Sequence, residues 1–253
     1  MGGGPKFRIP MSFPTVIYEK TDGIAWLTLN RPDRLNAFSV HMRDDLYQAM
    51  TAVRDDPDVL VAVLKGAGER AFCAGADLTE FGTAPSPVIA RQVRWERDLW
   101  GLMLGLPKPL IAAVHGFCLG SGLEMSLCCD LRIASDEARF GLPEVGLGII
   151  PAAGGSQTLP RVIGPARALD LVLTGDHIDA AEAHRIGLVN RVTSREALYA
   201  TAAALARRIA ALDPVVVQAA KLAVVRGLDL PLAEGLALEA QYVGLTLSRR
   251  KRG

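Results

Sequence analysis

The glycine-rich stretch HGFCLGSGLE at 115–124 is the feature of this sequence that most restricts the fold. It follows directly on the continuous apolar run LIAAV at 110–114 and opens a helical pattern. An apolar run of this kind is typical of a strand buried on both faces. Where a strand turns into a helix, the first N–H groups of the helix are unpaired, and the helix dipole favours negative charge beside them. A phosphate or a developing oxyanion is the natural occupant of such a turn.

A second glycine-rich stretch, AFCAGADL at 71–78, has a similar composition. Small residues let a ligand approach the backbone, although glycines also serve the turn itself. A nucleotide site is the main competing interpretation. However, Gly116, Gly120 and Gly122 do not follow the spacing GxGxxG, and neither GxxxxGKS nor GxxxxGKT occurs. The spacing therefore excludes Rossmann and P-loop sites, while an anion site and a purely structural turn both stay open.

Periodicity predicts alternating strands and helices up to about residue 192. We expect a hairpin over 15–29, a helix over 39–54 with Ser39 as its N-cap, a strand over 59–64 and a helix over 88–106. Three helices rich in Ala and Leu follow with no strand candidate between them, at 197–212, 215–226 and 232–247. The expected organisation is a flexible leader at 1–14, an α/β core at 15–194 and an all-helical region at 195–253.

Composition narrows the class of protein. Of the 253 residues, half are hydrophobic and 22% are charged, which excludes disorder of the whole chain. The net charge of +1 gives no general attraction to nucleic acid. No apolar run reaches 18 residues and the N-terminal stretch does not resemble a secretory signal, so we expect no membrane span and a cytoplasmic protein. The cysteines form no CxxC pair, and we expect buried reduced thiols at Cys73, Cys118, Cys128 and Cys129.

Two glutamates stand near the predicted oxyanion site. Glu124 falls three residues after Ser121 and shares its helical face, close to the exposed N–H groups. Glu144 lies twenty residues further on, in the stretch FGLPE at 140–144. An isolated glutamate is usually a solvated surface charge, but both of these occur in stretches that are otherwise apolar and rich in glycine. Two glutamates beside one oxyanion site suit general acid–base chemistry at a carbon next to a carbonyl.

Five pieces of sequence, in this order and spacing, make the chain resemble the crotonase superfamily, which is the enoyl-CoA hydratase/isomerase fold. The resemblance runs from about residue 15 to about residue 245. The pieces are LNRPDRLNAF at 29–38, AFCAGADL at 71–78, KPLIAAVHGFCLGSGLEMSLCCDLRIAS at 108–135, FGLPEVGLGIIPAAGGSQTLPRVIG at 140–164 and AAEAHRIGLVNRV at 180–192. The resemblance implies a crotonase-like spiral of ββα units, with an all-helical C-terminal region at 195–253 that assembles the chain into a homotrimer or homohexamer.

The resemblance also implies a site for the thioester of an acyl-coenzyme A. In the family, two backbone N–H groups form an oxyanion hole for the thioester oxygen, and they correspond to Ala76 and Ser121 here. Ser121 stands where many relatives have glycine, but only its N–H is used. Hydratases of the family keep two catalytic glutamates, which match Glu124 and Glu144, whereas simple enoyl isomerases usually keep only the second. No metal and no separate cofactor is implied, because coenzyme A is part of the substrate.

Further contacts to substrate and CoA are implied at other positions of the same motifs. They are Arg34, Leu35, Ala37, Ala74, Gly75, Asp77, Leu78, Gly120 and Ala152. The dehalogenase and dienoyl-isomerase branches carry aspartate where this chain has Ala152, which argues against both activities. Some relatives place a lysine near the CoA phosphates where this chain has Thr79. Arg34 is either a substitute for that positive charge or a plain surface arginine.

The leading hypothesis is an enoyl-CoA hydratase, which adds water syn to a trans-2-enoyl-CoA in fatty-acid or related acyl-CoA metabolism. The alternative within the same class is a double-bond isomerase that uses Glu144 to move a proton between carbons. The alternative outside it is a non-catalytic acyl-CoA-binding or RNA-binding protein of the same fold, for which the only support is the basic tip at 249–252. The acyl chain is expected to meet the loop at 80–94, and Trp95 and Trp100 either line that pocket or belong to the helix core.

Overall fold

The computed structural model describes residues 13–83 and 86–250. The predicted leader at 1–14 lies almost wholly outside these residues, as do Lys251 and Arg252 of the basic tip. Within the described part of the chain, no helix is both long enough and apolar enough to cross a membrane.

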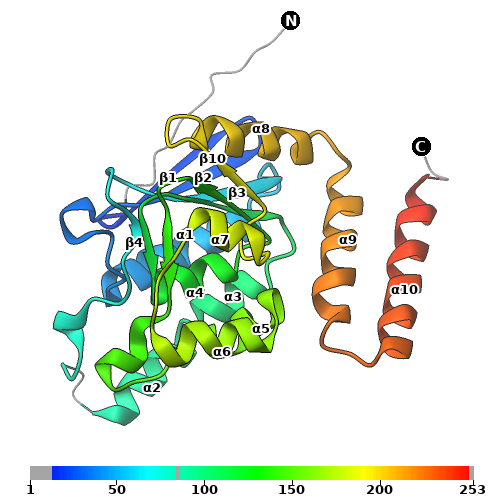
Figure 1. The fold of residues 1–253 in the computed structure, drawn as a ribbon. Helices are drawn as coiled ribbons and strands as arrows, with labels where there is room; N and C mark the ends of the chain where they lie inside the picture. The colour runs from blue at the N-terminus through cyan, green and yellow to red at the C-terminus, as the bar shows by residue number, and fades with distance from the viewer. Residues whose placement is uncertain (1–12, 84–85, 251–253) are drawn as a thin grey trace, which may run out of the picture.

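Two mixed sheets form the centre of the molecule (Figure 1). The strands of the larger sheet are β1 (Val16–Thr21), β2 (Ile24–Leu29), β3 (Val61–Gly66), β5 (Leu110–Val114), β7 (Leu131–Ser135) and β10 (Arg191–Thr193), in that spatial order. Those of the smaller sheet are β4 (Ala71–Cys73), β6 (Phe117–Leu119), β8 (Arg139–Gly141) and β9 (Ile178–Asp179), also in that order. The β1–β2 hairpin and the β8–β9 pair are antiparallel, and the remaining neighbours run parallel.

The chain alternates between the two sheets. The strands β3, β5 and β7 are each followed by a short strand of the smaller sheet and then by a helix or a 3-10 turn. This order confirms the expected succession of ββα units. Because β4 and β6 are parallel neighbours, with Cys73 opposite Cys118, both glycine-rich stretches leave the smaller sheet side by side.

The helices largely follow the expected pattern. They are α1 (Val40–Asp55), α2 (Pro87–Glu96), α3 (Leu99–Leu104), α4 (Ser121–Leu127), α5 (Gly155–Ile163), α6 (Pro165–Thr174), α7 (Ala180–Arg185), α8 (Leu198–Ala210), α9 (Pro214–Gly227) and α10 (Leu232–Arg250), with 3-10 turns η1 (Pro32–Arg34), η2 (Leu78–Glu80) and η3 (Pro143–Leu147). Ser39 caps α1 as predicted, because its Oγ accepts a hydrogen bond from Met42 N. The prediction of one helix over 88–106 is wrong: Asp98 accepts a hydrogen bond from Gly101 N and starts a second helix.

Helix α8 packs on the outer face of the larger sheet, although it was expected to belong to a separate helical region. Its buried stripe is Leu198, Ala202, Leu205 and Ala206, which meets Val61, Val63, Ile111, Ala113 and Ile133 of the sheet. Sequence periodicity identifies the helix but does not show what it covers. By this packing, α8 belongs with the sheet although it follows the predicted boundary near residue 195.

The helices α9 and α10 pair with each other and stand apart from the α/β body (Figure 1). Ala219 is the one buried hydrophobic residue that the described part of α9 contains, and α10 contributes none. A contact with the body runs through Lys221, whose Nζ lies 2.8 Å from Asp130 Oδ2 and donates to Lys108 O. This helical pair leaves large apolar side chains exposed, among them Val224, Leu228, Leu232, Val243 and Leu247.

Candidate active site

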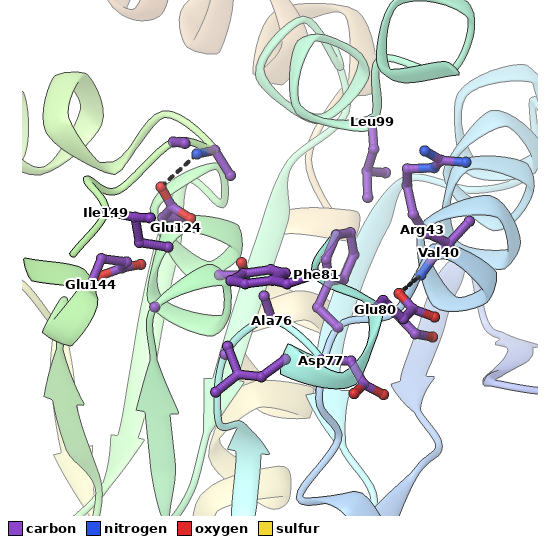
Figure 2. A pocket seen from close by; sticks show the side chains of 18 of the residues that line it. Val40, Arg43, Ala76, Asp77, Glu80, Phe81, Leu99, Glu124, Glu144 and Ile149 are labelled. Carbon is purple, nitrogen blue, oxygen red and sulfur yellow. Dashed lines mark hydrogen bonds between the residues drawn. The ribbon is translucent and has the colours of Figure 1, made fainter. Parts of the chain in front are cut away.

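A cavity of about 1040 Å³ opens where the two glycine-rich turns meet the loop before α5. Figure 2 shows it with Glu124 and Glu144 on one side, Ala76 and Phe81 in the middle, and Val40 and Arg43 on the other side. Ten of the predicted site residues line it: Ala74, Gly75, Ala76, Asp77, Leu78, Gly120, Ser121, Glu124, Glu144 and Ala152. The structure therefore brings together residues that are up to 78 positions apart in the sequence.

Glycine allows the two turns to approach each other. Gly75 has φ +115° and Gly120 has φ +48°, both in the region that side chains with a Cβ avoid. A Cβ on Gly122, at the start of α4, would collide with the carbonyl group of Cys73. The close contact between the β4 end and the α4 start therefore depends on glycine, and it places both turns at the edge of one cavity.

The backbone N–H groups of Ala76 and Ser121 are free to meet a ligand. Phe38 and Ala76 form an isolated β-bridge. Its hydrogen bonds run from Phe38 N to Gly75 O at 2.8 Å and from Asp77 N to Phe38 O at 2.9 Å, so it does not use the N–H of Ala76. Ser121 is the first residue of α4, and the first amide bonded within that helix is Glu124 N, which donates to Gly120 O at 2.9 Å. Neither amide has a hydrogen-bond acceptor among the described residues. Both residues line the cavity.

Glu124 is held by the backbone at the start of α5. Its Oε1 accepts hydrogen bonds from Ala153 N and Gly155 N, each at 2.9 Å, and the side chain is only 2% exposed. Hydrogen bonds from N–H groups to a carboxylate are charge-assisted and stabilise the anion. A Cβ on Gly155 would lie 2.9 Å from both Glu124 Cγ and Glu124 Oε1, so this cradle needs a glycine.

Glu144 has the opposite surroundings. It is the second residue of the turn η3 and is 9% exposed, and its Oε2 has no hydrogen-bond partner among the described residues. Burial, with a smaller contribution from the charge of Glu124, raises the pKa of Glu144. A Cβ on Gly120 would lie 3.0 Å from Glu144 Oε1, so the glycine of the α4 turn also makes room for this carboxyl group.

Three predicted CoA contacts, Arg34, Leu35 and Ala37, do not line the cavity. They belong to the turn after β2, beside the Gly75–Asp77 segment, where Ala74 N donates to Leu35 O at 3.1 Å. The side chain of Arg34 is exposed on this turn.

Sequence reasoning missed Arg31, which joins that turn to the cavity wall. Its Nη1 donates to Ala37 O at 2.6 Å, and its Nη2 donates to Asp77 Oδ2 at 2.8 Å. Hydrogen bonds from Thr79 and then from Arg31 lower the pKa of Asp77 to about 2. The pairing joins two of the recognised motifs, and no short-range spacing in the sequence indicates it.

The apolar lining of the cavity is more extensive than the sequence indicated. Trp95 and Trp100 both line it, and Trp100 also packs against Phe38 with ring centroids 5.4 Å apart. Phe81, Ile149 and Ile150 line it as well and are between 42% and 67% exposed. A run of apolar residues in irregular structure, such as Leu147 to Ile150, was the available signal for a binding wall.

Possible metal ligands and cysteines are other chemically reactive side chains of the chain. The described residues contain no group of three or more His, Cys, Asp or Glu side chains placed to hold a metal ion. All four cysteines are free and buried, as expected. Burial raises the pKa of Cys73 to about 11, so its thiol stays protonated near neutral pH.

Comparison with known proteins gives a consistent result. The family model described as "Enoyl-CoA hydratase/isomerase" matches residues 19–253. The chain is 41% identical to a crotonyl-CoA hydratase of Syntrophomonas wolfei, over 93% of this chain and 90% of that protein. It is 42% identical to an (E)-benzylidenesuccinyl-CoA hydratase of Thauera aromatica, over 87% of this chain and 86% of that protein. A solved enoyl-CoA hydratase from Bacillus anthracis superposes with a TM-score of 0.86 at 37% identity, covering 94% of this chain and 96% of that one.

Proposed function

The chain belongs to the enoyl-CoA hydratase/isomerase family, and from that premise we propose that it adds water reversibly and syn to a trans-2-enoyl-CoA, giving a 3-hydroxyacyl-CoA. One observation carries this proposal: two buried glutamates, Glu124 and Glu144, line the same cavity as the free amides of Ala76 and Ser121. The names of the hydratases to which the chain is about 41% identical agree with it.

The two amides are proposed to bind the thioester oxygen. When water adds to the double bond, negative charge moves onto this oxygen as an enolate develops. N–H groups of Ala76 and Ser121 that point at this position stabilise the charge more in the transition state than in the ground state, which lowers the barrier. One such donor typically contributes about 3–4 kcal/mol. The thioester itself makes the α-carbon acidic, so the mechanism uses no further cofactor.

The surroundings of the two glutamates suggest different roles. Glu124, bound to two backbone N–H groups, is the carboxylate that orients the water and takes its proton as the oxygen bonds to the β-carbon. Glu144 in its protonated form gives its proton to the α-carbon, and burial, which raises the pKa of this carboxyl group, favours that form. A proton passed from Glu124 back to Glu144 then restores the starting state. The reverse reaction follows the same path.

The proposal assigns the remaining predicted contacts to the rest of the substrate. Gly75, Asp77, Gly120 and the other predicted lining residues surround the thioester and the atoms next to it. The turn that carries Arg34, Leu35 and Ala37 lies beside the cavity and is proposed to hold part of the CoA. Arg34, which is exposed there, supplies a positive charge for a phosphate.

The test is the absorbance of the conjugated thioester after crotonyl-CoA is added to the enzyme. Hydration bleaches this absorbance and yields 3-hydroxybutyryl-CoA. Binding without bleaching would support a non-catalytic acyl-CoA-binding protein. Gain of the same absorbance from a 3-enoyl-CoA, with no bleaching of a 2-enoyl-CoA, would support a double-bond isomerase. No effect with any acyl-CoA would overturn the proposal.

We further propose a homotrimer or homohexamer in the cytoplasm. The support for assembly is the exposed apolar surface of α9 and α10, which a partner chain would cover. The support for the compartment is the set of four free, buried cysteines, which suits a reducing environment. Light scattering should give a mass of three or six chains. A stable monomer at micromolar concentration would contradict the assembly.

A further inference from the structure

Building on the proposed hydration, we infer that the preferred substrates carry a bulky apolar acyl group, with a ring or a medium-length chain beyond the double bond, rather than a crotonyl group. The volume of the cavity is the first reason. At about 1040 Å³, it slightly exceeds the roughly 300–1,000 Å³ that is usual for sites of drug-sized ligands, so it has room for an acyl group beside the thioester and the atoms next to it. A four-carbon acyl group would leave most of the wall opposite the glutamates without a partner.

That wall is apolar and largely aromatic. Figure 2 places Phe81 and Leu99 away from the glutamates, and Phe38, Ile89, Trp95 and Trp100 line the same cavity. In Figure 2, Phe81 lies in the middle of the cavity, between the two glutamates and Leu99. An acyl chain that begins at the oxyanion amides and extends away from Glu144 therefore runs along Phe81 toward Leu99.

Several apolar side chains of the cavity stay accessible in the free protein, although Leu99 is buried. Phe81 is 53% exposed and Ile89 is 44% exposed, while Ile149, which lies near Glu124, is 42% exposed. Covering such surface with an apolar ligand is favourable by roughly 25 cal/mol for each Å² removed from water. Aromatic rings add favourable ring–ring contacts when the ligand itself carries a ring. A short acyl group gains little of this.

The charged groups at the far wall do not favour an acyl group with a terminal carboxylate. Arg43 and Arg97 line the cavity there, but both pair with the same carboxylate, that of Asp44, at 2.7 and 2.6 Å. Glu80 and Asp98 line the same region and bring two more negative charges. Three carboxylates against two guanidinium groups leave no net positive charge to bind an anion. The charged wall therefore marks where an apolar acyl group ends.

The experiment compares four substrates by kcat/KM for hydration: crotonyl-CoA, trans-2-octenoyl-CoA, cinnamoyl-CoA and an eight-carbon trans-2-enoyl-CoA that ends in a carboxylate. Differences of one or a few carbons in an apolar pocket are worth roughly tenfold or more. We expect octenoyl- or cinnamoyl-CoA to exceed crotonyl-CoA by at least that factor, and the carboxylated substrate to fall at least tenfold below octenoyl-CoA. The better of these two apolar substrates shows whether the cavity prefers a chain or a ring. Equal values, or crotonyl-CoA as the best substrate, would overturn the inference.

Binding of saturated analogues tests the inference without the reaction. Calorimetry should give a lower Kd for octanoyl-CoA and 3-phenylpropionyl-CoA than for butyryl-CoA. If no enoyl-CoA is hydrated but this order of affinities holds, the proposed reaction fails and the acyl preference stands. If hydration is observed and the order is reversed, only the acyl preference fails.

A matched set of variants assigns the preference to this wall. In Phe81→Ala and Ile89→Ala, the ratio of kcat/KM for octenoyl-CoA to that for crotonyl-CoA should fall roughly tenfold, since each change removes apolar contact area. Leu173→Ala is the control, because Leu173 lies on α6, is 70% exposed and does not line the cavity. Its ratio should equal that of the unmodified enzyme. An unchanged ratio in both wall variants would place the preference elsewhere and overturn the assignment.

Discussion

Glu124 and Glu144 face the same cavity but lie in opposite surroundings. The backbone around Glu124 supplies two N–H donors from the start of α5, which hold one carboxylate oxygen in place. Around Glu144 the chain supplies burial, and one carboxyl oxygen has no partner among the described residues. The same side chain is thus stabilised as an anion in one place and as an acid in the other.

This contrast shows that the backbone gives two identical side chains different surroundings. The loop before α5 supplies hydrogen bonds to Glu124, whereas burial at the turn η3 raises the pKa of Glu144. Pairs of titratable groups whose surroundings separate their proton affinities are characteristic of acid–base catalysis. Substituting each glutamate in turn, and the glycine beside Glu124, tests this difference.

The largest effect is expected for Glu144→Gln. This change is nearly isosteric and removes the carboxyl group that gives a proton to the α-carbon in hydration and takes one from it in isomerisation of a 3-enoyl-CoA, so both reactions should fall by at least ~10²-fold in kcat. KM should change little, because the thioester and CoA contacts lie elsewhere. Steady-state kinetics of both reactions measure this. Hydration near the unmodified rate would show that Glu144 is not the acid.

Glu124→Gln should separate the two reactions. Hydration needs an oriented water and should lose at least ~10²-fold in kcat, while isomerisation uses no water and should keep more of its rate. The double variant should fall well short of the product of the single effects, because residues that act on one water and one proton act as a unit. Equal losses of both reactions in Glu124→Gln would remove the distinction between the two glutamates.

Gly155→Ala tests whether the backbone positions Glu124. The added Cβ would lie 2.9 Å from Glu124 Cγ, so the carboxylate must shift, although the backbone of residue 155 itself stays unstrained. Small misplacements of catalytic groups have large effects, and we expect kcat for hydration to fall roughly tenfold or more, with little change in KM. Gly146→Ala is the matched control, because a Cβ there meets nothing within 4 Å. Equal kcat values for both variants would contradict a positioning role for Gly155.

The pH dependence of the free energy of unfolding tests the raised pKa of Glu144 and leaves the hydrogen bonds of Glu124 unchanged. Because the pKa of Glu144 is raised above its ordinary value of 4.5 in the folded state, the native protein keeps a proton that the unfolded chain has released. The stabilisation from this proton is complete below pH 4.5 and is lost as the pH rises through the raised pKa. Urea unfolding at a series of pH values should therefore show a stability that declines with pH in this window. The decline should be smaller in Glu144→Gln, and equal slopes would refute the raised pKa.

Sequence reasoning selected side chains that line the cavity but not the contacts around them. Glu124 and Glu144 were selected from stretches that are otherwise apolar and rich in glycine, and the amides of Ala76 and Ser121 from the resemblance to the family. The hydrogen bond from Gly155 N to Glu124 and the ion pair between Arg31 and Asp77 join separate motifs, so they depend on tertiary packing. The α/β fold was predictable because the alternation of apolar runs and helical patterns depends only on residues that are close in the sequence. The covering of the sheet by α8, and the break between α2 and α3, required the packed structure.

The smallest effect is expected for Ser121→Ala, and it tests whether the turn beside both glutamates acts through its backbone alone. Ser121 opens α4 and lines the cavity, so its hydroxyl group is near enough to substrate to be a competing catalytic group. If only the N–H is used, Ser121→Ala and Ser121→Gly should both keep kcat within a few-fold of the unmodified enzyme, because both retain the amide. A loss of a hundredfold or more in both variants would show a catalytic hydroxyl. A loss in Ser121→Gly alone would indicate instead that the turn needs a Cβ to hold its conformation. Glycine has more backbone conformational freedom than serine, and this freedom is lost when the turn is fixed.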